Sequence, residues 1–179
     1  QPQAGDVIVS KSISEAMTHL KCGKKVFLAP KAEEACFVNS VKTQFTTDFW
    51  SVGTFPQQSG YMGIFPDPKH PLFNCFPTDE HSDWQWWSLT NSRAMVLDEK
   101  TEPLFDVLDS YARLRKLAFM VEAKVGKGKL LLCSMGLEEK CEYPEVRAML
   151  KSIYSYMNSD DFNPRQELTE EALKRLLNV

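Results

Sequence analysis

The chain has 179 residues, of which 43% are hydrophobic and 25% are charged, and its formal net charge is -3. This balance predicts one ordinary globular domain that needs neither a metal nor disulfides to fold. The weakly negative charge and the dispersed lysines and arginines argue against a nucleic-acid partner. No apolar run is long enough to cross a membrane and no signal peptide is present, so no membrane partner is expected.

The N-terminal part of the chain has the pattern of a strand, a helix and a second strand. Residues 6–10 and 25–29 are apolar runs typical of buried strands. Between them, Ser12 and Glu15 match the S-x-x-E capping box at a helix start, and Gly23 suits the end of that helix. Such a unit predicts a parallel sheet.

The second half of the chain predicts two further strands, a helix and a hairpin. Residues 93–97 form an apolar run typical of a strand, and apolar side chains recur at helical spacing over 104–114. Apolar and polar residues alternate over 119–125, glycines stand at 126 and 128, and an apolar run covers 129–134. We interpret this last stretch as an antiparallel hairpin, not as a phosphate loop, because it leads into a strand.

Two helices are predicted near the C-terminus. Residues 146–157 are amphipathic at helical spacing, and residues 169–177 begin with acidic side chains that suit a helix N-terminus. Residues 1–179 are therefore expected to form a single α/β domain, with residues 165–179 as a C-terminal helical extension. The opening Gln1-Pro2-Gln3 looks like a cut inside a longer multidomain chain.

The segment 67–89 stands apart from this pattern because prolines and aromatic residues crowd it. It holds three of the four tryptophans and two of the three histidines, and long irregular segments inside compact domains are often functional. In extended backbone, Trp84 and Trp86 share one face and Trp87 takes the other. Such indoles suit a core corner, a domain interface or a sugar-stacking platform. The candidate carbohydrate or interface residues are Trp50, His70, His81, Asp83, Trp84, Trp86 and Trp87.

Signatures of catalysis and of metal binding are mostly missing. The sequence has no G-x-S-x-G or G-x-C-x-G elbow, and Cys133, at the end of an apolar run, is best interpreted as a buried structural cysteine. The five cysteines form no CxxC motif. Asp79, Glu80, His81 and Asp83 offer acid–base or metal chemistry, but local turn and capping hydrogen bonds are the favoured interpretation. No catalytic residue, metal site or cofactor is predicted.

Several stretches resemble the far C-terminal region of bacterial glycoside hydrolases of family 2, the β-galactosidase and β-glucuronidase kind. The most specific is the H-S-D-W-Q-W-W segment at residues 81–87. The resemblance covers most of the chain from about Lys25 onward. It also includes His70-Pro71-Leu72, Phe76-Pro77-Thr78, Arg93-Ala-Met-Val-Leu97, Gly126-Lys-Gly-Lys-Leu-Leu-Leu-Cys-Ser134, Tyr156-Met157 and Phe162-Asn-Pro164.

The resemblance implies an appended domain and not a complete enzyme. In that family the catalytic acids lie on a separate barrel, which this chain is too short to contain. The region looks like a class I glutamine-amidotransferase-like domain: a three-layer flavodoxin-like sheet with helices on both faces, one antiparallel hairpin and a long aromatic insertion. The nucleophile elbow and the histidine–glutamate pair of true amidotransferases are absent. The resemblance places the parent enzyme in the periplasm or outside the cell.

Three functions are therefore carried forward. The leading hypothesis is a non-catalytic accessory domain of a bacterial glycosidase, whose aromatic segment packs within the domain and against a neighbouring domain or subunit, including a second copy. The first alternative is a carbohydrate-binding module that stacks Trp84, Trp86 or Trp87 on a glycan. The second alternative is a degenerate amidotransferase-like hydrolase that uses Cys133 or the His81–Asp83 pair.

Overall fold

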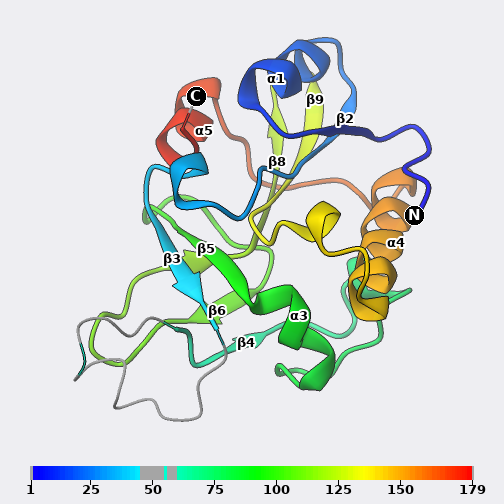
Figure 1. The fold of residues 1–179 in the computed structure, drawn as a ribbon. Helices are drawn as coiled ribbons and strands as arrows, with labels where there is room; N and C mark the ends of the chain where they lie inside the picture. Colours follow the sequence, from blue (N-terminus) through cyan, green and yellow to red (C-terminus); the bar gives the residue numbers. More distant parts are fainter. Residues whose placement is uncertain (1, 45–54, 56–59, 179) are drawn as a thin grey trace.

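The computed structural model describes residues 2–44, 55 and 60–178 and shows a mixed α/β fold with two sheets (Figure 1). The α/β class is thereby confirmed. The strands are β1 (Ile8–Ser10), β2 (Lys25–Leu28), β3 (Ser40–Thr43), β4 (Gly63–Phe65), β5 (Ser92–Val96), β6 (Asp106–Leu108), β7 (Leu117–Ala118), β8 (Met120–Val125) and β9 (Gly128–Cys133). The α-helices are α1 (Ile13–Lys21), α3 (Trp87–Thr90), α4 (Pro144–Asn158) and α5 (Glu170–Leu176). Single 3₁₀ turns form η1 (Glu34–Cys36), η2 (Pro71–Phe73), η3 (Trp84–Trp86) and η4 (Leu137–Glu139).

The first sheet, which we call the mixed sheet, has the strand order β1-β2-β9-β8. β1, β2 and β9 run parallel, and β8 returns antiparallel to β9, so the predicted β-α-β unit and hairpin are both confirmed. Ser12 Oγ accepts the N–H of Glu15 at 3.3 Å, and Gly23 adopts a φ of 77° after the helix. The capping box is only half formed, because the Glu15 carboxylate accepts from Ser10 Oγ.

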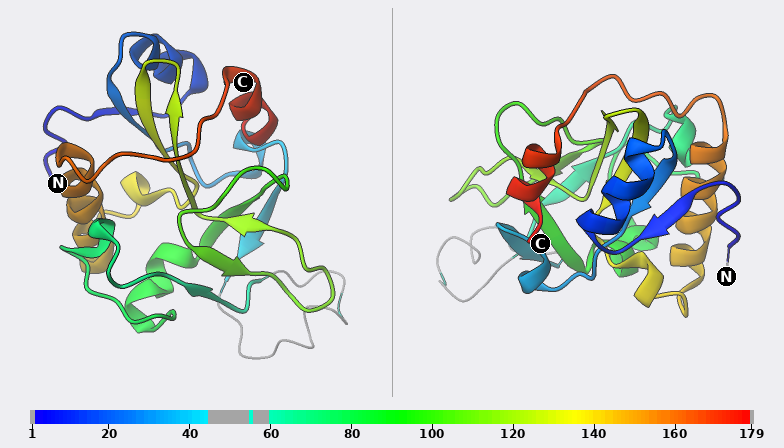
Figure 2. Two further views of the ribbon diagram at one scale, coloured as in Figure 1. Left: turned by 180° about the vertical axis from the view of Figure 1, so that it is seen from behind. Right: turned by 90° about the horizontal axis from the view of Figure 1, so that it is seen from above.

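Helices cover both faces of the mixed sheet. Val26 and Leu28 belong to the apolar cluster that contains the inner faces of α1 and α5. Phe27 faces the other way into the cluster around α4, where its ring meets the Tyr154 ring at 5.8 Å. In the right-hand view of Figure 2 the strands lie between α5 (red) and α4 (orange). Burial on both faces explains why these strands show near-continuous apolar runs.

The second sheet is fully antiparallel, in the order β3-β5-β7-β6-β4, and only β5 was predicted. The two sheets join at Phe119, because the chain pairs in the antiparallel sheet at β7 and in the mixed sheet at β8. Ser134 stabilises this junction with two hydrogen bonds. Its N–H donates to the Phe119 carbonyl, and its Oγ donates to the carbonyl of Arg93 in β5.

The predicted helix over 104–114 is wrong. The structure has β6 there, followed by a turn in which Leu114 adopts a positive φ of 49°. The Asp109 carboxylate accepts the N–H groups of Ser110 and Arg115 and so organises the turn. A local side-chain acceptor of this kind competes with helix formation. Strand pairing and this turn together override a helical spacing of apolar residues.

The two C-terminal helices are confirmed, with Pro144 in the first turn of α4 and Thr169 as the N-cap of α5. α5 is integrated in the core, since Leu173 and Leu176 share an apolar cluster with α1. Leu177 also forms a bridge with Phe37. None of the helices in the described ranges has the length and apolar character needed to span a membrane.

Candidate functional site

The aromatic segment contains two consecutive helical turns, η3 and α3. Asp83 starts the first of them: its Oδ1 accepts the N–H of Gln85 at 3.0 Å, which confirms the capping interpretation for this residue. Residues three apart lie on the same side of a helical turn. Trp84 and Trp87 therefore share one side and Trp86 points the other way, so the arrangement expected for extended backbone is wrong.

Trp86 belongs to the core. Its side chain is fully buried, and its ring makes edge contacts with Phe73 at 6.0 Å, Phe76 at 5.2 Å and Phe105 at 5.6 Å between centroids. Its Nε1–H donates to Thr78 Oγ1 at 2.8 Å, which satisfies the polar end of a buried indole. One of the three tryptophans thus anchors the segment in the domain and is not available to a partner.

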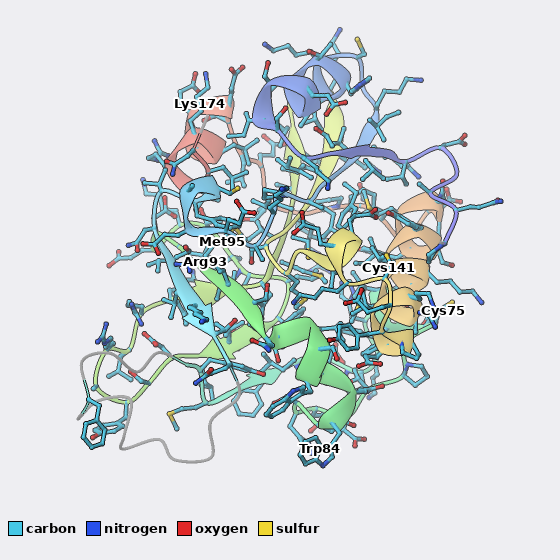
Figure 3. The ribbon with its side chains drawn as sticks, in the orientation of Figure 1. Cys75, Trp84, Arg93, Met95, Cys141 and Lys174 are labelled. Carbon is cyan, nitrogen blue, oxygen red and sulfur yellow. The ribbon has the colours of Figure 1, made fainter. Side chains whose placement is uncertain are left out.

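Trp84 and Trp87 form an exposed surface, which we call the indole pair. Their relative exposures are 82% and 46%, and their rings lie 5.6 Å apart with an angle of 35° between the planes. Figure 3 shows Trp84 projecting away from the ribbon at one end of the molecule. Two large apolar rings gathered at the surface are typical of a contact or ligand site.

A pocket of about 280 Å³ opens beside the indole pair and is lined by Tyr61, Ser82, Asp83, Trp84 and Trp87. The Asp83 side chain is a carboxylate and Ser82 is a hydroxyl, so the pocket combines apolar rings with hydrogen-bonding groups. The hydroxyl of Tyr61 donates a hydrogen bond to Thr90 Oγ1, which fixes the position of the Tyr61 ring. The pocket can accept a ligand that has one flat apolar face and polar edges.

Lys140 fixes α3, the helix that carries Trp87. Its Nζ donates to the carbonyl oxygens of Ser88 at 3.0 Å and Asn91 at 2.7 Å, and Ser88 Oγ in turn donates to Glu145 Oε1. A cation at a helix C-terminus satisfies carbonyls that have no intrahelical partner. Lys140 is partly buried, and this burial lowers the pKa of its ammonium group.

Replacing Lys140 with methionine is expected to lower the free energy of unfolding by about 1–3 kcal/mol, because partly buried carbonyls lose a charged donor. Urea denaturation measures this change. The matched control is Lys151→Met on α4, whose side chain is exposed and is expected to change stability by less than about 0.5 kcal/mol. Equal effects of the two substitutions would contradict the role given to Lys140.

The remaining candidate residues are dispersed. His70 lines a separate cleft, and its Nδ1 accepts the N–H of Leu72 at 3.2 Å. His81 is exposed at the surface, and Trp50 lies outside the described residues. Within the described ranges, no three histidine, cysteine or carboxylate side chains come together as metal ligands. The structure thus brings Asp83, Trp84 and Trp87 together at one pocket, and neither His70 nor His81 lines it.

Cys133 is buried, as interpreted from the sequence, and burial raises the pKa of its thiol to about 12. A neutral thiol in an apolar site is a poor nucleophile. β9 continues into a turn whose left-handed residue is Gly136, with a φ of 61°, directly before η4. Hydrolases that use a strand–turn–helix elbow place the nucleophile at such a strained position. Here a Cβ atom would lie 2.9 Å from Ala32 Cβ, so the turn has no room for a side chain without a shift.

Sequence reasoning missed Ser82 as a pocket residue and Lys140 as the support of α3. The signal for the indole pair was present: an aspartate directly before Trp84 is a helix N-cap residue, and i,i+3 spacing joins Trp84 to Trp87. Ser82 and Lys140 carried no such signal, because each role depends on residues that only the fold brings together.

Comparison with known proteins gives one family match. A family model described as a domain of unknown function (DUF8487) matches residues 7–178, which is nearly the whole chain. Among curated proteins, none matches the sequence.

Proposed function

Since this chain belongs to the DUF8487 family of domains of unknown function, we propose its role from its own residues. It is a non-catalytic accessory domain of a bacterial glycan-degrading enzyme, and the indole pair docks it onto another domain or subunit of that enzyme. The observation that carries the proposal is the exposed indole of Trp84, which is 82% exposed and packs at a tilt against the Trp87 ring at the surface.

The indole pair has the character of a binding hot spot. Tryptophan is among the residues most enriched where truncation to alanine costs an interface the most affinity. The Asp83 cap fixes the turn that carries Trp84, and the Lys140 contacts fix the helix that carries Trp87. Both residues are therefore positioned in the absence of a partner. A pre-organised surface loses little conformational entropy on docking, which favours affinity.

The fold supports an accessory role beside an enzyme. We propose that the mixed sheet, with α1 and α4 on opposite faces, is a reduced flavodoxin-like core of the class I glutamine-amidotransferase-like kind. Its buried Cys133 and the glycine at position 136 support the absence of a nucleophile from that core. The parent enzyme would hydrolyse O-glycosyl bonds with acids on another domain, and would act in the periplasm or outside the cell.

Two assays test this proposal. The isolated chain is expected to leave aryl-glycosides intact, and measurable hydrolysis by pure protein would contradict it. The isolated chain is also expected to bind the rest of its parent enzyme in titration calorimetry. Trp84→Ala should weaken that binding by about 30-fold, the result of losing a hot spot of about 2 kcal/mol. Lys174→Ala on α5 is the control, and equal weakening by both substitutions would refute docking through the indole pair.

A second candidate function is glycan binding at the same surface. It is favoured by Ser82 and Asp83, whose hydroxyl and carboxylate line the pocket beside the rings as sugar hydroxyls require. Oligosaccharides are then expected to change the tryptophan fluorescence saturably, and Trp87→Ala is expected to abolish the change. A flat titration across plant and host glycans would contradict this function.

A further inference from the structure

We propose that a second cleft, distinct from the indole pocket, binds a small neutral polyhydroxylated ligand such as a single sugar residue. The cleft has a volume of about 790 Å³ and lies between η2, β8, the end of α4 and the segment that follows α4. In the left-hand view of Figure 2 that segment (orange-red) crosses the back of the molecule, with η2 (teal) beside α4. The cleft and the indole pocket share no lining residue.

The acceptor side of the cleft is a carboxylate held in place by a tyrosine. Tyr156 is 4% exposed, and its hydroxyl donates to Glu122 Oε2 at 2.7 Å. Glu122 is partly buried, and within the described part of the chain it forms no ion pair. A carboxylate has about four acceptor positions, so most of its acceptor capacity remains for a ligand.

The donor side comes from His70, Asn163 and Arg165. Because Nδ1 of His70 accepts the Leu72 N–H, a neutral ring carries its proton on Nε2 and offers it as a donor. The Arg165 guanidinium is exposed and, among the described residues, takes part in no ion pair. Donors and acceptors therefore line the same cleft without neutralising one another.

One wall of the cleft is rigid. The Gln166 side chain donates to the carbonyl oxygens of Glu102 and Glu122, each at 2.8 Å, and accepts the Glu102 N–H. The Glu102 carboxylate is itself paired with Lys116 at 2.9 Å. A site whose wall is fixed before binding and whose polar groups converge on a cavity has the build of a ligand pocket.

The balance of groups selects the ligand class. A simple anion would face the Glu122 and Asp161 carboxylates, and a simple cation would face Arg165. A hydroxyl both donates and accepts, so neighbouring hydroxyls on one ring can satisfy a carboxylate and a guanidinium together. Pro71 and Leu104 add apolar surface for the C–H face of such a ring. A neutral sugar meets all of these conditions.

Titration of the ¹⁵N-labelled 179-residue chain with glucose, galactose and mannose tests the proposal by amide chemical shifts. At least one sugar is expected to give saturable shifts centred on the amides of residues 70, 122, 163, 165 and 166. Glu122→Gln, which keeps an oxygen acceptor for Tyr156, is expected to weaken binding about tenfold, and Arg165→Ala by a similar factor. Lys174→Ala on α5 should leave this binding unchanged, because Lys174 does not line the cleft.

Three other results would contradict the proposed sugar site. Shifts that fail to saturate with every sugar, or that centre on the indole pair, would refute the cleft as a sugar site. Tighter binding of acetate or of methylammonium than of any neutral sugar would refute the ligand class. Unchanged affinity in both Glu122→Gln and Arg165→Ala, with each variant still folded by its amide spectrum, would also contradict the proposal.

Discussion

Replacing Trp86 with alanine is expected to lower the free energy of unfolding by about 3–5 kcal/mol, the usual cost of removing a large aromatic side chain from a core. Trp86 is fully buried among Phe73, Phe76 and Phe105, so its removal leaves a cavity bounded by aromatic edges. The substitution also leaves Thr78 Oγ1 without the indole N–H donor. Urea denaturation followed by far-ultraviolet circular dichroism measures the change.

The neighbouring tryptophan provides the matched control. Trp84 is two residues away but 82% exposed, so Trp84→Ala is expected to change the free energy of unfolding by less than about 0.5 kcal/mol. The pair of variants separates an indole that stabilises the domain from an indole that serves an outside contact. Comparable destabilisation by the two substitutions would show that this division of roles is wrong.

Replacing Asp109 with alanine is the second substitution with a large expected effect, a loss of about 2–4 kcal/mol in the free energy of unfolding, because a buried carboxylate acceptor is removed from a partly buried ion pair and from two backbone N–H groups. The Asp109 side chain is 1% exposed and accepts Nε–H of Arg115 at 2.7 Å. It also accepts the N–H groups of Ser110 and Arg115. Thermal and urea unfolding measure the loss, and Asp106→Ala on the exposed side of β6 is the control.

The Asp109 carboxylate also makes the stability of the domain depend on pH. Burial raises the pKa of Asp109, but the hydrogen bonds and charge of Arg115 and the Ser110 N–H outweigh it, so the net pKa in the folded state is lowered. Because its pKa is lower in the folded state, the Asp109 carboxylate stabilises the fold at pH values above the unfolded-state pKa of about 3.9. This stabilisation is lost as the pH falls through the folded-state pKa. Wild type is therefore expected to lose stability below about pH 4 more steeply than Asp109→Ala. Parallel pH profiles would contradict this.

Local elements were predictable because their signals lie within a few residues. Ser12 and Gly23 mark the ends of α1, and Gly126 adopts the positive φ of 58° that its turn requires. The near-continuous apolar runs of the mixed sheet reflect burial on both faces. These features do not depend on where distant parts of the chain lie.

The antiparallel sheet was not predictable in the same way. Its strands are two to five residues long, and β7 has only Leu117 and Ala118, too few to show an alternation. Pairing with distant partners, such as β4 with β6, stabilises them. For residues 67–89, which carry the tryptophans, the sequence predicted functional importance but not the direction of each side chain. That importance followed from composition, whereas the inward turn of Trp86 depended on the helical conformation that Asp83 begins.

Hydroxyl-radical footprinting of the tryptophans tests the central claim most directly, with the isolated chain compared against its complex with the parent enzyme that we propose. In the isolated chain, Trp84 and Trp87 are expected to be oxidised readily and Trp86 to be protected. In that complex, oxidation of Trp84 and Trp87 is expected to fall to the level of Trp86, because the proposed partner domain or subunit would cover them. Undiminished oxidation of both residues in the complex would contradict a docking role for the indole pair.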